Sequence, residues 1–155
     1  MHIRALGFTA SFIALVTFAN AAHAETEFEG ALCFTSASAA CHAEGWSTGC
    51  FGARYAPRDL GDNGPDTELS LFARTFAVGF MLPSGNPVSP TLYNVTMSKV
   101  ARGGYTHPVK FRLKAQTPSA PTPSTQNITF RGVFANWDEI AGCTMEFNSA
   151  LTKKP

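Results

Sequence analysis

The stretch VKFRLKA, residues 109–115, alternates apolar and cationic side chains at every position. Successive side chains of a β-strand point to opposite faces, so this pattern predicts a strand with one face in a core and the other in water. The same stretch has no apolar repeat of 3.6 residues, the period that a helix requires. Residues 109–115 therefore predict a sheet that is buried on one face only, which is typical of antiparallel sheets.

Similar alternation recurs over most of the chain, separated by segments rich in glycine, proline and asparagine. The strands expected from it are 28–34, 51–55, 67–82, 93–97, 109–115, 128–131 and 143–147. Gly79, inside the longest of these, is expected to mark a bulge or bend. About seven short strands with frequent turns predict an all-β fold: an antiparallel β-sandwich or, as the alternative, a small β-barrel.

Two segments depart from this pattern. Residues 36–44 are rich in alanine and predict one short helical turn. Residues 117–125 contain three prolines, which cannot donate hydrogen bonds to a ladder, so we expect an exposed loop there. Because amphipathic strands are expected on both sides, this loop is interpreted as a connection within a single domain.

Residues 1–24 have the composition of a signal peptide. Arg4 is followed by the apolar stretch 5–19 and by the small residues of Ala22-His23-Ala24. The apolar stretch has about 15 residues, whereas a membrane-spanning helix needs about 20. We expect cleavage after Ala24, leaving one domain, 25–155, in the periplasm or outside the cell and without a membrane span.

The charge balance of residues 25–155 disfavours nucleic acid as a partner. Without Arg4, eleven basic residues remain against eleven acidic ones. A nucleic-acid-binding surface requires a clustered excess of lysine and arginine, and a neutral chain does not provide it.

Four cysteines lie beyond the expected cleavage site: Cys33, Cys41, Cys50 and Cys143. Thiols of exported proteins are normally oxidised, so two disulfides are expected. Three pairings are possible. In each of them Cys143 joins the C-terminal segment to the N-terminal cluster, and the other bridge is local. No C-x-x-C spacing occurs, which disfavours a metal site made by these cysteines.

Residues 45–49, GWSTG, match the G-x-S-x-G pentapeptide that carries the nucleophile of α/β-hydrolases. In that interpretation Ser47 is the nucleophile, Asp66 the acid and His107 the base, which makes the chain a small secreted serine hydrolase. The context favours a different interpretation, because two cysteines bracket the motif and a strand is expected after it where the hydrolases have a helix. A glycine-flanked turn is the preferred prediction.

Residues 59–68, DLGDNGPDTE, form the densest group of oxygen ligands in the chain. Calcium takes six to eight oxygens, so this segment is a candidate calcium loop, although its spacing departs from the EF-hand pattern. Such residues also form ordinary turns, because their side chains hydrogen-bond the nearby backbone. The candidate calcium ligands are Asp59, Asp62, Asn63, Asp66 and Glu68.

Trp46 and Trp137 are the candidate binding residues, because indole rings stack on sugars and anchor protein interfaces. Trp137 stands before Asp138 and Glu139 in an expected turn, which predicts that it is partly exposed. Packing in the core is the other interpretation of both tryptophans.

These observations favour an exported, non-catalytic β-domain with a binding or structural role. The sequence does not decide whether the chain is an enzyme, and it predicts no cofactor other than the candidate calcium. A protein or a carbohydrate is the expected kind of ligand. Two alternatives remain: the serine hydrolase that uses Ser47, and a calcium-dependent carbohydrate-binding module that combines the 59–68 loop with an exposed tryptophan.

Overall fold

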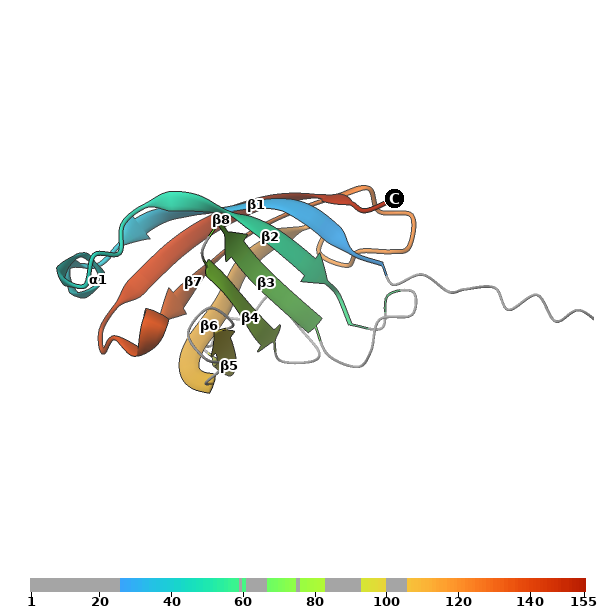
Figure 1. Cartoon of the computed structure of the whole chain (residues 1–155). Helices are drawn as coiled ribbons and strands as arrows, with labels where there is room; N and C mark the ends of the chain where they lie inside the picture. Colours follow the sequence, from blue (N-terminus) through green and yellow to red (C-terminus); the bar gives the residue numbers. More distant parts are fainter. Residues whose placement is uncertain (1–25, 59, 61–66, 75, 83–92, 100–105) are drawn as a thin grey trace, which may run out of the picture.

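The structure is a computed structural model of the chain, shown in Figure 1. It describes residues 26–58, 60, 67–74, 76–82, 93–99 and 106–155. Within these ranges no helix is long and apolar enough to cross a membrane.

The described residues form eight strands, each antiparallel to the next along the chain. Because β8 also pairs with β1, the sheet closes into a barrel. The strands are β1 (Phe28–Ala37), β2 (Gly49–Ala56), β3 (Thr67–Ala73), β4 (Phe76–Leu82), β5 (Tyr93–Lys99), β6 (Thr106–Thr117), β7 (Asn127–Ala135) and β8 (Thr144–Lys153). Among the described residues the ladders differ in length, from nine residue pairs between β1 and β8 to three between β4 and β5.

The all-β class, the antiparallel pairing and the two disulfides are confirmed. Of the two expected architectures the structure has the barrel, the alternative, because all described strands belong to one sheet. The alternation of apolar and polar side chains does not distinguish a sandwich from a barrel. It indicates that one face of each strand is buried, and this face can pack against either a second sheet or the far side of its own sheet.

The expected long strand at 67–82 is a hairpin, and this is the origin of the eighth strand. The register runs from Ala73 opposite Phe76 to Thr67 opposite Leu82. Gly79 lies inside this regular ladder, opposite Ser70, so it does not mark the bend that the sequence suggested. The chain reverses after Ala73, where the sequence has none of the glycine, proline or asparagine that usually announces a turn.

Alternate side chains of the strands fill the barrel. In β6, Val109, Phe111 and Leu113 are buried, whereas Lys110 and Lys114 are exposed, as their alternation predicts. On the outer surface Lys114 forms an ion pair with Glu146 of β8. The outer face of this part of the wall is therefore charged and exposed to solvent.

Gly132 of β7 makes room for an aromatic ring inside the barrel. Its partner on β8 is Phe147, and a Cβ atom at position 132 would lie 2.6 Å from the Phe147 ring, closer than real contacts allow. The Phe147 ring packs with those of Phe111 and Phe134, at centroid distances of 6.0 and 5.1 Å. A large ring on one strand is thus matched by a missing side chain on the next, as close packing requires.

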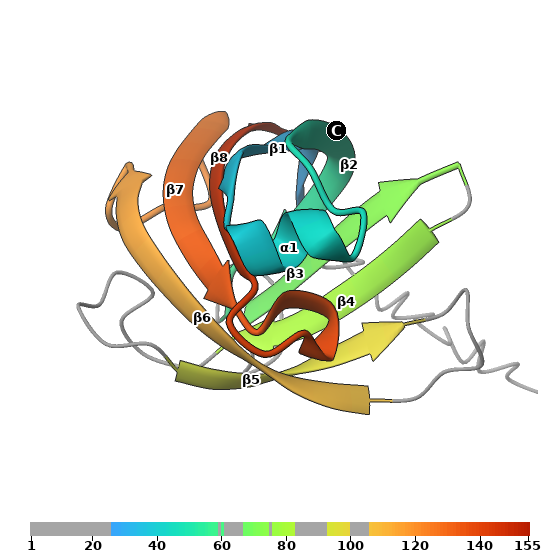
Figure 2. The ribbon, with the colours of Figure 1, turned by 90° about the vertical axis from the view of Figure 1, so that its left-hand side faces the viewer.

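The two ends of the barrel are covered differently. The helical end carries residues 38–48, with α1 (Ala39–Ala43), and residues 136–143, with the 3₁₀ helix η1 (Trp137–Glu139). Figure 2 shows both helices lying across the barrel at this end. The opposite end, where β1 begins and β8 finishes, is called the terminal end below; Figure 1 shows α1 and the C-terminus at opposite ends.

Charged side chains gather at the terminal end. The carboxylate of Glu27, which is buried, pairs with Arg54 and, at 3.4 Å, with Lys154. The Lys154 ammonium also lies 3.3 Å from Glu29, and hydrogen bonds to Glu29 and then to Glu27 raise the pKa of Lys154. These ion pairs join the start of β1 to β2 and to the segment after β8.

A buried hydrogen-bond chain also lies at the terminal end. The Tyr55 hydroxyl donates to Gln116 Oε1 at 3.2 Å, and Gln116 Nε2 donates to the backbone oxygens of Pro118 and Ser119 at 3.2 and 3.4 Å. Burial raises the pKa of Tyr55. The chain fastens the proline-rich connection between β6 and β7 to the inside of the barrel.

Candidate functional site

Two disulfides hold the barrel, and one of them joins the two segments that cover the helical end. Cys41 of α1 is bonded to Cys143, which precedes β8, and both residues are fully buried. Cys33 and Cys50 are bonded to each other from facing positions of β1 and β2. The prediction that Cys143 ties the C-terminal segment to the N-terminal cluster is confirmed, as is the prediction of a local second bridge. Two disulfides indicate an oxidising, non-cytoplasmic environment.

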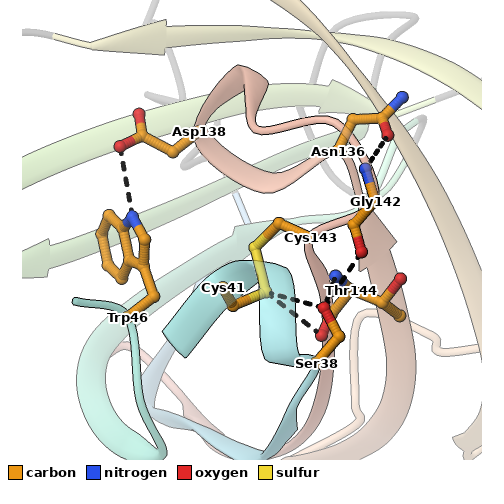
Figure 3. Close-up of a disulfide and its surroundings, with 8 residues drawn as sticks. All are labelled: Ser38, Cys41, Trp46, Asn136, Asp138, Gly142, Cys143 and Thr144. Carbon is orange, nitrogen blue, oxygen red and sulfur yellow. Dashed lines mark hydrogen bonds between the residues drawn. A yellow bond between two sulfur atoms is a disulfide. The ribbon is translucent and has the colours of Figure 1, made fainter. Parts of the chain in front are cut away.

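Hydrogen bonds around the buried disulfide fix the two segments that it joins (Figure 3). The Ser38 hydroxyl donates to the Gly142 backbone oxygen and accepts from the Thr144 backbone N–H, both at 3.0 Å. The Gly142 N–H in turn donates to Asn136 Oδ1 at 3.3 Å. The beginning of α1 and the beginning of β8 are therefore held by polar contacts as well as by the covalent bond.

Trp137 closes the barrel at the helical end. Its side chain is fully buried, with its ring centroid 4.9 Å from that of Phe34 and 5.2 Å from that of Phe134. The Trp46 ring meets it nearly at right angles, at 5.3 Å. The expected partial exposure of Trp137 is therefore wrong, since η1 turns its indole inward, and only Trp46, which is half-buried, reaches the surface.

The backbone of η1 adopts an unusual conformation. Asn136, Asp138 and Glu139 have φ angles of 57°, 54° and 64°, in the left-handed region that L-residues other than asparagine and aspartate seldom enter. The backbone N–H of Trp137 donates to the backbone oxygen of Cys143 at 3.2 Å and thereby ties this turn to the disulfide. This conformation places the Asp138 carboxylate at the helical end, next to Trp46 in the loop that follows α1.

Trp46 and Asp138 meet at this place and form the wall of a pocket. Trp46 Nε1 donates to Asp138 Oδ2 at 3.2 Å, which Figure 3 shows beside the disulfide. The pocket has a volume of about 490 Å³, and its lining consists of Glu44, Gly45, Trp46, Asp138 and Ile140. We call it the helical-end pocket. Two carboxylates and an indole face a common space, and this arrangement can hold a ligand by charge, by hydrogen bonds and by contact with an aromatic ring.

The three residues of the predicted hydrolase are not brought together by the described part of the structure. Ser47 is exposed in the loop between α1 and β2, where its hydroxyl lies 3.5 Å from the Thr48 oxygen. His107 belongs to β6, of which only the backbone is described at this position, and Asp66 lies outside the described residues. The order around Ser47 is helix, loop, strand, whereas a nucleophile elbow has strand, turn, helix. The catalytic role of Ser47 stays a prediction.

The candidate calcium loop lies mostly outside the described residues, as do Asp59, Asp62, Asn63 and Asp66. Glu68, its last candidate ligand, is exposed on β3. Among the residues that the structure describes, no three His, Cys, Asp or Glu side chains gather closely enough to hold a metal ion. The calcium prediction is neither supported nor opposed by this part of the chain.

Sequence reasoning found Trp46 but not Glu44 or Asp138 as its neighbours. These two acids are far apart in the sequence, and nothing in either local pattern links them. The signal that links them is the disulfide, because Glu44 follows Cys41 closely and Asp138 precedes Cys143. With that pairing known, the loops that carry the two acids are expected to meet.

Comparison of the chain with protein-family models, with curated proteins and with solved structures finds no match. The site is therefore interpreted from its own geometry.

Proposed function

We propose that this protein is an exported, non-catalytic binding domain that holds its ligand in the helical-end pocket. The observation that carries the proposal is the contact of Trp46 with Asp138 in the wall of a pocket of about 490 Å³. The disulfide between Cys41 and Cys143 braces both loops of this pocket. Preorganised sites of this kind lose little entropy when a ligand binds, and this favours affinity.

Export supports the same proposal. Residues 1–24 have the order of a signal peptide, and two disulfides fit an oxidising compartment. The proposed location is the periplasm or the outside of the cell. Mass spectrometry of the protein recovered from its producing cells tests this part, with a mature N-terminus at Glu25 as the expected result. Recovery of intact chains that begin at Met1 would contradict it.

The binding proposal is tested with the mature, disulfide-bonded protein and a ligand library of amines, peptides, oligosaccharides and carboxylates. Binding is measured by the shift in Tm. We expect at least one class to raise Tm, and we expect Trp46→Ala to weaken its binding about tenfold or more, because truncating an aromatic anchor of a binding site commonly costs over 1 kcal/mol.

The matched control is Phe72→Ala, which removes an exposed aromatic ring from β3, outside the pocket. This variant is expected to bind as the unmodified protein does. If no class of the library binds, or if binding survives Trp46→Ala unchanged, the proposed pocket is not the functional site.

A further inference from the structure

We infer that the disulfide between Cys33 and Cys50 is a thiol-exchange site, and that a groove beside it recognises a small thiol carrying a carboxylate. This site is separate from the helical-end pocket and lies on the outer wall of the barrel. Cys50 is exposed and Cys33 is half-buried, whereas both cysteines of the other bridge are fully buried. Exchange requires a thiolate to reach a sulfur atom, so the folded barrel opens the wall disulfide to attack and protects the other one.

The register of the ladders places this disulfide in a row of outward side chains. Each member of the row lies opposite the next on the neighbouring strand, and from β6 to β2 the members are Ala115, Arg131, Asn148, Cys33 and Cys50. The residues before and after Arg131, Asn148 and Cys33 along their strands are buried, so the row itself faces outward. Neighbouring strands lie about 4.8 Å apart, so the backbones of Arg131 and Cys33 are about 10 Å apart.

A groove on the outer wall covers the part of this row that lies on β6, β7 and β8. It has a volume of about 350 Å³, and its lining includes Ala115, Arg131 and Asn148. The pairing of β6 with β7 shifts register between Leu113 and Ala115, and such bulges often lie next to functional sites. Asn148 faces Cys33 directly, so the groove ends one strand away from the disulfide.

Arg131 sets the charge of the ligand. Its side chain is exposed and forms no ion pair with any described residue, and the described lining of the groove contains no acid. A guanidinium binds a carboxylate through two parallel hydrogen bonds, and the amide of Asn148 offers a further donor. A small thiol whose carboxylate is held by Arg131 extends across Asn148 and brings its sulfur to Cys33.

The reaction is an exchange of disulfides and consumes no oxidant or reductant. The thiolate of the ligand attacks Cys33 Sγ, which it meets first when it approaches from the groove. A bond forms between these two sulfurs, the bond to Cys50 breaks, and its electron pair stays on Cys50 as a thiolate. The product is a mixed disulfide at Cys33. Because β1 and β2 remain paired and the buried bridge stays closed, the barrel survives the exchange.

The test uses the mature, disulfide-bonded protein at one pH. The anion 3-mercaptopropionate is compared with its methyl ester, which carries the same thiol without the charge. Each rate is divided by the rate of the same thiol with oxidised mercaptoethanol, a neutral reference disulfide, to remove differences in intrinsic reactivity. Iodoacetamide stops the reaction and marks free thiols, and mass spectrometry locates the adduct.

We expect the adduct on Cys33, alkylation on Cys50 and an intact bridge between Cys41 and Cys143. The relative rate of the anion should exceed that of the ester by about threefold, because an exposed ion pair contributes on that scale. This advantage should shrink as salt is raised, since salt screens exposed charges.

Variants then assign the preference to the groove. Arg131→Gln is expected to remove the advantage of the anion and to leave the rate of the ester unchanged. Lys110→Gln is the matched control, because it removes an exposed cation from β6 outside the groove, and it should keep the full preference. Both residues are exposed, so both variants are expected to fold, and the thermal melting curve of each checks this.

Three results would contradict the inference. If the buried bridge reacts as fast as the wall disulfide, or if neither reacts until the protein unfolds, the wall disulfide is not an exchange site. If the ester matches the anion, or if Arg131→Gln keeps the preference, the groove does not recognise the thiol. An adduct on Cys50 in place of Cys33 would mean that the thiol does not approach from the groove. None of these results bears on binding in the helical-end pocket.

Discussion

The two ends of the barrel are covered by different kinds of interaction. Each must cover the rim of an apolar core, where strands finish and backbone groups lose their ladder partners. The helical end does so with a buried disulfide and the indole of Trp137, which need no charge. The terminal end uses the ion pairs of Glu27 and the buried hydrogen bond of Tyr55. A covalently braced end keeps its geometry when pH or salt changes, and this suits it to hold a binding site.

The largest effect that this comparison predicts comes from the helical end. The bond between Cys41 and Cys143 closes a loop of 102 residues, and loss of a loop of that size costs about 4.7 kcal/mol on polymer-entropy grounds. The double variant Cys41→Ala, Cys143→Ala is expected to lose stability on that scale and to lose the binding attributed to the helical-end pocket. Urea unfolding without reductant measures the first effect and calorimetry the second.

The matched variant Cys33→Ala, Cys50→Ala opens a bridge of 17 residues between strands that already face each other. It is expected to cost less, about 3 kcal/mol, and to leave ligand binding intact. Equal losses in the two double variants, or lost binding in the second, would show that the helical end is not the specially braced one.

The next effect belongs to the terminal end and appears at alkaline pH. Burial raises the pKa of Tyr55, so above pH 10 this hydroxyl ionises in the unfolded chain and not in the folded one. Its contribution is complete below pH 10 and is lost as pH rises. At pH 11 the free energy of unfolding is expected to be lower by about 1.4 kcal/mol on account of this group.

Tyr55→Phe is the control for this prediction. The variant loses the hydrogen bond to Gln116 at every pH, at a cost of about 1 kcal/mol, but it should not share the alkaline loss. Urea unfolding at pH 8, 10 and 11 compares the two proteins. Parallel pH curves would mean that Tyr55 is not protected from ionisation, and the terminal end would then be no more pH-dependent than the helical one.

The smallest effect is expected on the wall between the ends. A hydrogen bond from Lys114, followed by its charge, lowers the pKa of Glu146. The stabilisation is complete above about pH 4.3, the ordinary value for glutamate, and is lost as pH falls through the lower pKa of the folded state. For so exposed a pair we expect a few tenths of a kcal/mol, measured as the difference between the unmodified protein and Lys114→Met at pH 6 and pH 3. A difference above 1 kcal/mol would show that the wall depends on charge as strongly as the terminal end does.

The sequence predicted the parts of this fold that depend on local alternation. Val109 to Leu113 lies in β6 with the expected faces, and residues 36–44 contain the short helix α1. A register shift after Leu113 pairs Ala115 with the exposed Arg131, so the expected alternation ends before Ala115. The cysteines predicted which segments are tied together. The hairpin within 67–82 was missed because its turn carries no glycine, proline or asparagine, and turn residues are the only local signal of a reversal.

The candidate site was predictable only in part. Trp46 was a candidate from its residue type, but Glu44 and Asp138 join it through the pairing of Cys41 with Cys143, which sequence alone left open among three choices. The inward turn of Trp137 depends on left-handed backbone angles at its neighbours, and no periodicity records such angles. For this reason, local sequence patterns do not predict a site that is assembled from loops far apart in the sequence.

We expect the barrel to open first at the short ladder between β4 and β5. Only Val78, Gly79 and Phe80 pair with β5 among the described residues, whereas the ladder between β1 and β8 has nine pairs. Local opening is easiest between the strands that are joined by the fewest hydrogen bonds. The amides of β4 should therefore exchange with deuterium sooner than those of β8. An opened seam exposes two strand edges, and unpaired edges recruit other chains. Self-association on heating or storage should therefore begin at this seam, on the flank of the barrel that neither disulfide spans.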